Sequence, residues 1–243
     1  MTLVFTLLRK DHIIFASDSL HVRGTAEGRY KNENAWKVEP ILKGYGLLGF
    51  AGQDYAEEIV REAKRNGTFQ KSSLRATVAG IESIKESLYT SDQRLNMNVQ
   101  FLLAGFEDGI AKSVEMRGPI IPIPCSYDEK SDNFQIIGVR EHGALYVLRK
   151  CAADCLNIEA GIRLAYFALA EVGKYEIRVD GIRQVYAIRP GQPAEIDKSA
   201  EAHTRWAEEV GERIRTLIVS PKSSESDPRR SKRDRSIRPA SRE

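Results

Sequence analysis

Thr2 is the residue whose type and position offer the clearest chemistry in the sequence. Its side chain is small enough for a methionine aminopeptidase to remove Met1, which would leave Thr2 with a free α-amino group beside its hydroxyl. An α-amine has a pKa of about 7.7–8, so near neutral pH it can accept the hydroxyl proton. Thr2 would then be a nucleophile that carries its own general base. On position alone, however, a threonine at the start of a strand is ordinary.

Two charged residues, Asp18 and Lys37, stand in or beside apolar runs. Asp18 follows Phe15-Ala16-Ser17, and Lys37 lies between Trp36 and Val38. A buried lysine near a threonine hydroxyl lowers the proton affinity of the adjacent amine by like-charge repulsion, and a buried aspartate holds such a lysine in place. The simpler alternatives are a turn former at Asp18 and an edge-strand residue at Lys37.

A glycine-containing segment, Gly49-Phe50-Ala51-Gly52, separates an apolar strand from a helix that is expected to begin at Asp54. Backbone N–H groups at a helix start can bind the oxyanion that forms when a hydroxyl attacks a carbonyl. Gly49 or Gly52 could supply such a group, or both could simply allow a strand-to-helix turn. The segment has too few glycines for a dinucleotide fingerprint and lacks the Gly-Lys-Ser/Thr ending of a P-loop.

The apolar pattern predicts the elements that must position these residues. Strands are expected at Leu3–Leu8, Ile13–Ser17, Trp36–Leu42, Tyr45–Phe50, Asn98–Phe106, Ile110–Met116, Phe134–Gly138 and Gly181–Ile188. Helices are expected at Asp54–Asn66, Ser73–Tyr89, Gly143–Leu156, Ile158–Gly173 and Ser199–Val219. Arg23–Asn34 reads as a polar excursion, and Gly118–Pro124 as a proline-broken edge strand or loop. Two helices between groups of antiparallel strands predict an α+β fold in which two stacked sheets lie between helix layers, a four-layer αββα sandwich.

The charge distribution separates a core from a tail. The 243 residues carry a net charge of +3, yet residues 220–243 hold eight basic and four acidic residues, so residues 1–219 carry −1. The tail has almost nothing apolar to bury and is expected to be disordered. A nucleic-acid or partner-docking arm is the alternative, but no aromatic residues interleave to stack bases. We therefore expect one domain over residues 1–219, a basic tail over 220–243 and no nucleic-acid binding.

The remaining composition argues against several other classes of protein. No secretory signal leads the sequence and no apolar run approaches the length of a membrane span. Cys125, Cys151 and Cys155 are an odd number, and the last two are spaced poorly for a disulfide. We read them as thiols in a reducing compartment and expect a cytoplasmic protein. The four histidines are scattered, so neither a metal site nor a cofactor is expected.

Together these residues resemble the proteasome β-subunit family and the bacterial proteasome-like threonine peptidases of the N-terminal nucleophile hydrolase superfamily. The resemblance covers about residues 1–190 in the order of elements and rests on the segments Thr2–Val4, Phe15–Ser19, Lys37–Val38, Leu48–Asp54 and Val99–Gly109. It implies Thr2 as nucleophile, with Asp18 and Lys37 as the supporting pair. It implies Gly49 or Gly52 as oxyanion donor and places His21, Ala35 and Gly49 near the specificity pocket.

The second half of the chain departs from the family pattern. A Gly-Ser-Gly stretch is replaced by Gly138-Val139-Arg140, and a later Asp-x-x-Ser-Gly by Glu176–Gly181, so that Glu176 could stand for the aspartate while Val179 has no hydroxyl. The resemblance implies a threonine-type endopeptidase in a homo-oligomeric ring that acts on peptides or proteins, with any ATPase unfoldase partner unknown. A decayed, structural subunit and a small-molecule amidase of the same fold remain open alternatives.

Overall fold

The computed structural model describes residues 2–24, 30–34, 36–52, 54–90, 93–94, 98–118, 120–131, 133–138, 143–155, 157–175 and 182–219. Ala35, Glu176, Val139, Val179 and the tail 220–243 lie outside the described residues, so the expectations placed on them stay untested.

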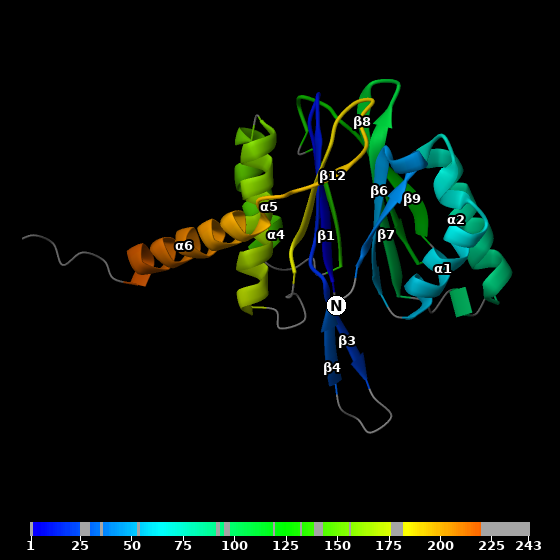
Figure 1. Cartoon of the computed structure of the whole chain (residues 1–243), viewed down its shortest axis with the longest axis horizontal. Helices are drawn as coiled ribbons and strands as arrows, with labels where there is room; N and C mark the ends of the chain where they lie inside the picture. Colours follow the sequence, from blue (N-terminus) through cyan, green and yellow to red (C-terminus); the bar gives the residue numbers. More distant parts are fainter. Residues whose placement is uncertain are drawn as a thin grey trace, which may run out of the picture.

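Two five-stranded sheets form the middle of the molecule (Figure 1). The first has the order β10-β1-β2-β11-β12, with β1 at Leu3–Leu8, β2 at Ile13–Ser17, β10 at Phe134–Gly138, β11 at Gln184–Ile188 and β12 at Glu195–Ile196. The second has the order β5-β6-β7-β8-β9, with β5 at Val38–Ile41, β6 at Gly46–Gly52, β7 at Val99–Glu107, β8 at Ile110–Arg117 and β9 at Ile120–Ser126. All neighbouring strands are antiparallel, and β9 lies at a sheet edge.

The helices cover the outer faces of the sheets (Figure 1). Two of them, α1 (Asp54–Arg65) and α2 (Leu74–Leu88), pack on the second sheet, while α4 (Gly143–Cys151) and α5 (Ile158–Tyr175) pack on the first. The last helix, α6 (Ala200–Val219), contacts α5 and extends away from the sheets. Short 3-10 turns lie at Leu42–Gly44, Thr68–Gln70 and Ala152–Asp154. The expected α+β arrangement of helix layers around two sheets is confirmed.

Side-chain alternation along β1 shows how the layers are joined. Leu3, Phe5 and Leu7 belong to the core between the first sheet and α4 and α5, whereas Val4 and Leu8 belong to the core between the two sheets. Successive side chains of a strand point to opposite faces, so a strand buried on both faces is apolar at nearly every position. A third core fills the space between the second sheet and the helices α1 and α2.

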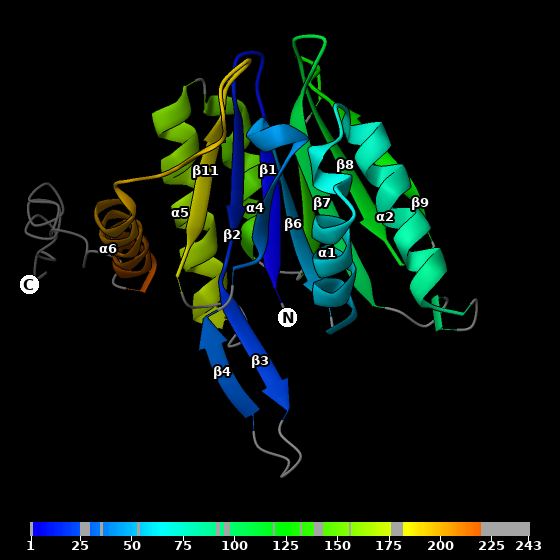
Figure 2. The same ribbon diagram turned by 45° about the vertical axis from the view of Figure 1, so that its right-hand side comes forward.

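One expectation about the strands is corrected. The expected polar excursion at Arg23–Asn34 contains part of a hairpin, in which β3 (Leu20–Gly24) pairs with β4 (Tyr30–Asn34). The hairpin projects beyond the sandwich (Figure 2), so it has no sheet face against which an apolar stripe would pack. A polar sequence could therefore form strands without the apolar pattern from which strands are predicted.

A second correction concerns the helix expected at Gly143–Leu156. The helix α4 ends at Cys151, and a 3-10 turn follows at Ala152–Asp154. The buried Arg9 accounts for this ending, because its guanidinium donates to the carbonyl oxygens of Ala152 and Cys155, the latter at 2.9 Å. Carbonyl groups at a helix end have no partner within the helix, and a cation satisfies them well.

None of the helices in the described part of the chain is both long and apolar enough to cross a membrane. Cys125, Cys151 and Cys155 are free thiols.

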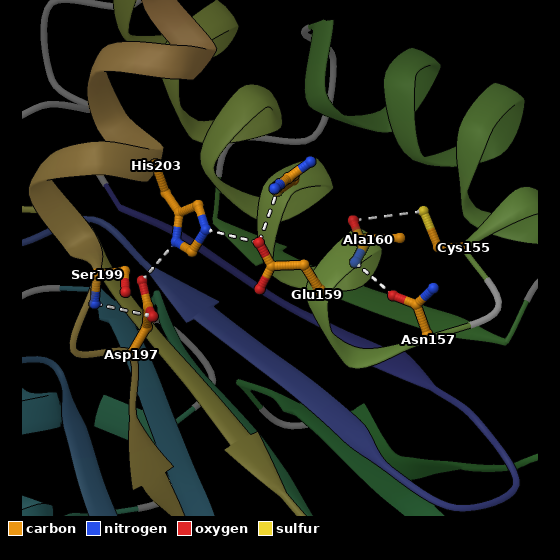
Figure 3. Close-up of polar contacts among 8 residues, drawn as sticks. Cys155, Asn157, Glu159, Ala160, Asp197, Ser199 and His203 are labelled. Atoms are coloured by element: carbon orange, nitrogen blue, oxygen red, sulfur yellow. Dashed lines mark hydrogen bonds and ion pairs between the residues drawn. The ribbon is translucent and has the colours of Figure 1, made fainter.

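His203 on α6 fixes this helix to the rest of the protein (Figure 3). Its Nδ1 lies 2.9 Å from Asp197 Oδ2, just after β12, and its Nε2 lies 3.0 Å from Glu159 Oε1 on α5. Burial opposes the charge of the ring, but the hydrogen bonds to the two carboxylates raise the pKa of His203 above its ordinary value. With a carboxylate at each nitrogen, the imidazolium can donate to both.

We expect the free energy of unfolding to depend on the charge of His203. Because its pKa is raised in the folded state, this stabilisation is fully present below about pH 6.5 and is lost as the pH rises through the folded-state pKa. His203→Phe keeps a ring at the position that packs 5.5 Å from the Tyr166 ring but binds no proton. Near pH 6 the variant should be less stable by about 1–3 kcal/mol in urea unfolding. The difference between the two proteins should shrink at alkaline pH, and an equal difference at every pH would contradict the assignment.

Candidate active site

Asp18 is the point at which three segments of the chain meet. Its Oδ1 accepts a hydrogen bond from the backbone N–H of Leu3 at 2.8 Å, and its Oδ2 accepts one from Lys37 Nζ at 3.0 Å. The Asp18 N–H in turn donates to the Leu3 carbonyl oxygen at 3.2 Å. The side chains of Asp18 and Lys37 are 2% and 5% exposed, so the ion pair is buried.

The register of β1 and β2 explains this position. Val4 lies opposite Ser17, so Asp18 falls opposite Leu3, one step past the end of β2. Ser17 Oγ donates to the Asp18 carbonyl oxygen at 2.8 Å, and Ser19 Oγ accepts from the N–H of Ile182 at 2.7 Å. These contacts, the first buried and the second partly buried, fix the backbone on both sides of Asp18, so its carboxylate is held with little freedom to move.

Thr2 lies immediately before β1 and is 7% exposed. Its carbonyl oxygen rests against Gly138 at the end of β10, where a Cβ atom added to Gly138 would come within 1.6 Å of it. Gly138 also has a φ of +89°, a region that glycine adopts far more easily than other residues. The backbone of Thr2 is therefore confined by Gly138 on the β10 side, and the Leu3 amide that follows it is held by Asp18 on the β2 side.

Lys37 is a buried cation whose pKa is set by its surroundings. Burial lowers the pKa of Lys37, while the carboxylates of Asp18 and Glu57 partly offset this effect. Glu57 belongs to α1, which packs on the second sheet, so this helix contributes a negative charge near Asp18 and Lys37. A desolvated cation next to a nucleophile acts more strongly than an exposed one, because little solvent screens its field.

The two candidate oxyanion glycines differ in position. Gly49 lies inside β6, between Val38 of β5 and Leu102 of β7, and a Cβ atom there would come 2.5 Å from Val4 Cγ1. Its role in the fold is to let the two sheets approach each other. Gly52 ends β6 with a φ of +134°, two residues before α1 begins. Gly52 is therefore the one that stands where a strand turns into a helix.

The other predicted site residues are described only in part. His21 lies in β3, where it pairs with Glu33 of β4, and the base of this hairpin is at the end of the sandwich where β1 begins (Figure 2). Ala35 and Glu176 lie outside the described residues. Within the described part of the chain, no three or more His, Cys, Asp or Glu side chains form a group that could hold a metal ion.

Three residues that act on or contact the candidate site are not among the site residues predicted from the sequence. They are Glu57, whose charge acts on Lys37, Gly138, which abuts Thr2, and Gln100, whose Oε1 accepts the Gly138 N–H at 2.7 Å. Gln100 could be recognised from the sequence, because it is a polar residue on the face of β7 whose other positions are apolar and pack against the first sheet. Glu57 carries none, since a glutamate on an amphipathic helix is ordinary.

Comparisons with known proteins give matches to solved structures. No family model matches the sequence, and no curated protein matches it either. Anbu (ancestral beta-subunit) from Yersinia bercovieri matches with a TM-score of 0.72 and 12% identity, over 90% of this chain and 97% of that one. Anbu from Hyphomicrobium sp. strain MC1 matches with a TM-score of 0.70 and 11% identity over the same shares. A structure titled as a helical assembly of the Anbu complex from Pseudomonas aeruginosa matches with a TM-score of 0.65 and 13% identity, over 88% and 96%. The chain therefore has the fold of the Anbu proteins.

Proposed function

We propose that this protein is a threonine-type peptidase that uses Thr2, after removal of Met1, to hydrolyse peptide bonds within an assembly of identical subunits. The observation that carries the proposal is the contact of one buried carboxylate, Asp18, with both the Leu3 amide and the Lys37 ammonium. A buried ion pair often contributes little to stability, because desolvating both charges is costly. This favours a role for the pair in positioning Thr2 and in setting the protonation of its α-amine.

The reaction begins when the Thr2 hydroxyl oxygen attacks the carbonyl carbon of a peptide bond. The hydroxyl proton passes to the Thr2 α-amine, and the positive charge of Lys37 keeps that amine partly unprotonated at neutral pH. The N–H of Gly52 is suited to bind the oxyanion, because it lies at the turn into α1. The protonated amine then gives its proton to the leaving nitrogen, which departs and leaves an ester on Thr2. Water, deprotonated by the same amine, cleaves the ester and restores the hydroxyl.

Two other functions use the same fold. A structural subunit without activity would keep the Asp18–Lys37 pair although the pair no longer serves catalysis. A small-molecule amidase would use the same nucleophile, Thr2, on a different acyl group. Hydrolysis of peptides compared with short acyl amides separates the peptidase from the amidase. The absence of any covalent reaction at Thr2 would leave only the structural subunit.

We also propose that copies of this chain assemble through α6. One apolar stripe runs along this helix and consists of Trp206, Val210, Ile214 and Leu217. Val210 is half-buried and the other three are exposed, Leu217 to 71%. Trp206, Val210 and Ile214 line an open groove against α5 of about 460 Å³, which we call the α5–α6 groove. An antiparallel α6 of a second copy would add its apolar stripe to this groove.

Charge supports a second copy as the occupant of the α5–α6 groove. In an antiparallel pair centred on Gly211, Glu209 of one copy faces Arg213 of the other, and the reverse pair forms by symmetry. The structure titled as a helical assembly of the Anbu complex shows that a chain with this fold can form an extended assembly. Whether the copies here close into a ring or form an open helix follows from the particle shape in electron microscopy.

The first prediction of the proposed function concerns the nucleophile. Intact-mass measurement should show that Met1 is absent from the purified protein, and an electrophilic probe for N-terminal threonines should add one equivalent at Thr2. Thr2→Ala should abolish labelling and peptide hydrolysis, whereas Thr2→Ser should keep both because it retains a hydroxyl next to the α-amine. Retention of Met1 would block the amine and refute the mechanism.

The second prediction separates stability from catalysis at the Asp18–Lys37 pair. Lys37→Met leaves the buried Asp18 carboxylate without its cation and should lower the free energy of unfolding by about 3–5 kcal/mol. Adding Asp18→Asn removes the unpaired charge while an amide oxygen still accepts from the Leu3 N–H, so most of the stability should return. Hydrolysis should stay about 10²–10⁴-fold below wild type in both variants. Activity that returns together with stability would show that the pair is only structural.

The third prediction concerns assembly. Leu217→Glu places a charge in the exposed apolar stripe of α6 and should lower the particle mass measured by size-exclusion chromatography with light scattering. Thr216→Glu is the matched control, because it adds the same charge to an exposed position on another side of the same helix. A particle mass unchanged by Leu217→Glu, or a wild-type monomer, would contradict assembly through α6.

A further inference from the structure

Gln100 is a polar residue in an apolar position. It lies near the start of β7, between Ala51 of β6 and Arg117 of β8. The next two residues on the same face of the strand, Leu102 and Ala104, belong to the core between the two sheets. Gln100 is half-buried, and the part of its side chain that lies between the sheets is stabilised by a polar partner, because an unsatisfied polar group there is unfavourable.

The partner of Gln100 belongs to the opposite sheet. The backbone N–H of Gly138, at the end of β10, donates to Gln100 Oε1 at 2.7 Å. This hydrogen bond crosses the space between the sheets and joins residues 38 positions apart in the sequence. It replaces a contact that a strand end would otherwise have to make with a neighbouring strand or with water.

Gly138 is in direct backbone contact with Thr2, so a shift of Gly138 would also affect Thr2. Gly138 pairs with Leu3, and its Cα lies so close to the Thr2 carbonyl oxygen that no side chain fits between them. If the Gly138 N–H lost its acceptor, the end of β10 would be free to shift toward other partners. The Thr2 backbone would then lose its confinement on the β10 side, while Asp18 would still hold the Leu3 amide on the β2 side.

We infer that Gln100 is a positioning residue for Thr2, which holds the end of β10 against the nucleophile through its hydrogen bond to Gly138. This inference rests on the proposed function, in which Thr2 is the nucleophile. Gln100 acts through Gly138 and need not touch the substrate. Its loss should therefore lower kcat and leave KM nearly unchanged, because a misplacement of the nucleophile by about 1 Å can cost about 10²-fold in rate.

The test compares two substitutions at Gln100 with a matched control. Gln100→Met keeps the length of the side chain but has no acceptor of comparable strength, whereas Gln100→Glu keeps a carboxyl oxygen that can accept the Gly138 N–H. The control is Gln135→Met on β10. Gln135 also joins the two sheets, since its Oε1 accepts from Ser113 Oγ at 2.6 Å and its Nε2 donates to the Ile123 carbonyl oxygen at 2.9 Å, and it lies three residues before Gly138.

Two measurements are made on each full-length protein. The first is kcat and KM for peptide hydrolysis, where we expect Gln100→Met to lower kcat about 10–100-fold, Gln100→Glu to stay within about 3-fold of wild type, and Gln135→Met to change kcat little despite a lower unfolding midpoint. The second is hydrogen exchange of the Gly138 amide, which donates to Gln100, read by mass spectrometry of peptides that span the end of β10. It should be about 10-fold faster in Gln100→Met than in the other proteins.

The outcomes distinguish this inference from the proposed function. A wild type that neither hydrolyses peptides nor reacts at Thr2 refutes the proposed function, and the hydrogen exchange of the Gly138 amide then shows by itself whether Gln100 holds the end of β10. Equal losses of kcat in Gln100→Met and Gln135→Met would show a general loosening of the sandwich and overturn the inference. So would a Gln100→Glu variant as impaired as Gln100→Met, or a Gly138 amide whose exchange is unchanged in Gln100→Met.

Discussion

The buried carboxylate of Asp18 is the constraint on which the rest of the site depends. Moving an aspartate and a lysine out of water is costly, and the cost is recovered only when each lone pair and proton finds a well-placed partner. Here the partners are the Leu3 amide and the Lys37 ammonium. Strands β1 and β2 and the segment before β5 are thereby held together at one point. A shift of any of these segments would leave a charge buried without its partner.

Close backbone contacts set the space around this pair. Gly49 lets β6 approach Val4 and Phe15 in the core between the sheets, and Gly138 lets the end of β10 approach Thr2. A methyl group at either position would collide with its neighbours, so these glycines determine how near the two sheets and the start of β1 can lie. The geometry around Thr2 therefore depends on the absence of a Cβ atom at Gly49 and Gly138 as well as on the side chains of Asp18 and Lys37.

Much of the fold could be predicted from the sequence, because strands buried on both faces and amphipathic helices leave strong patterns. The segments at β1, β2, α1 and α2 are of this kind. The hairpin of β3 and β4 was missed because it packs on no sheet face and so carries no apolar stripe. The early end of α4 was missed because its cause, the guanidinium of Arg9, comes from a residue far away in the sequence. At the site, Asp18 and Lys37 were recognisable as charges beside apolar runs, whereas the contact of Gln100 with Gly138 depends on how two sheets are stacked.

The burial of Thr2 has a consequence for the order of events in the life of the chain. Thr2 is 7% exposed, and the strand that follows it is buried along its whole length. An aminopeptidase needs an extended N-terminus that it can draw into its own active site, which a residue packed between a carboxylate-bound strand and a glycine does not offer. The nucleophile proposed here would therefore have to be unmasked before β1 packs into the sandwich, so that removal of Met1 precedes folding.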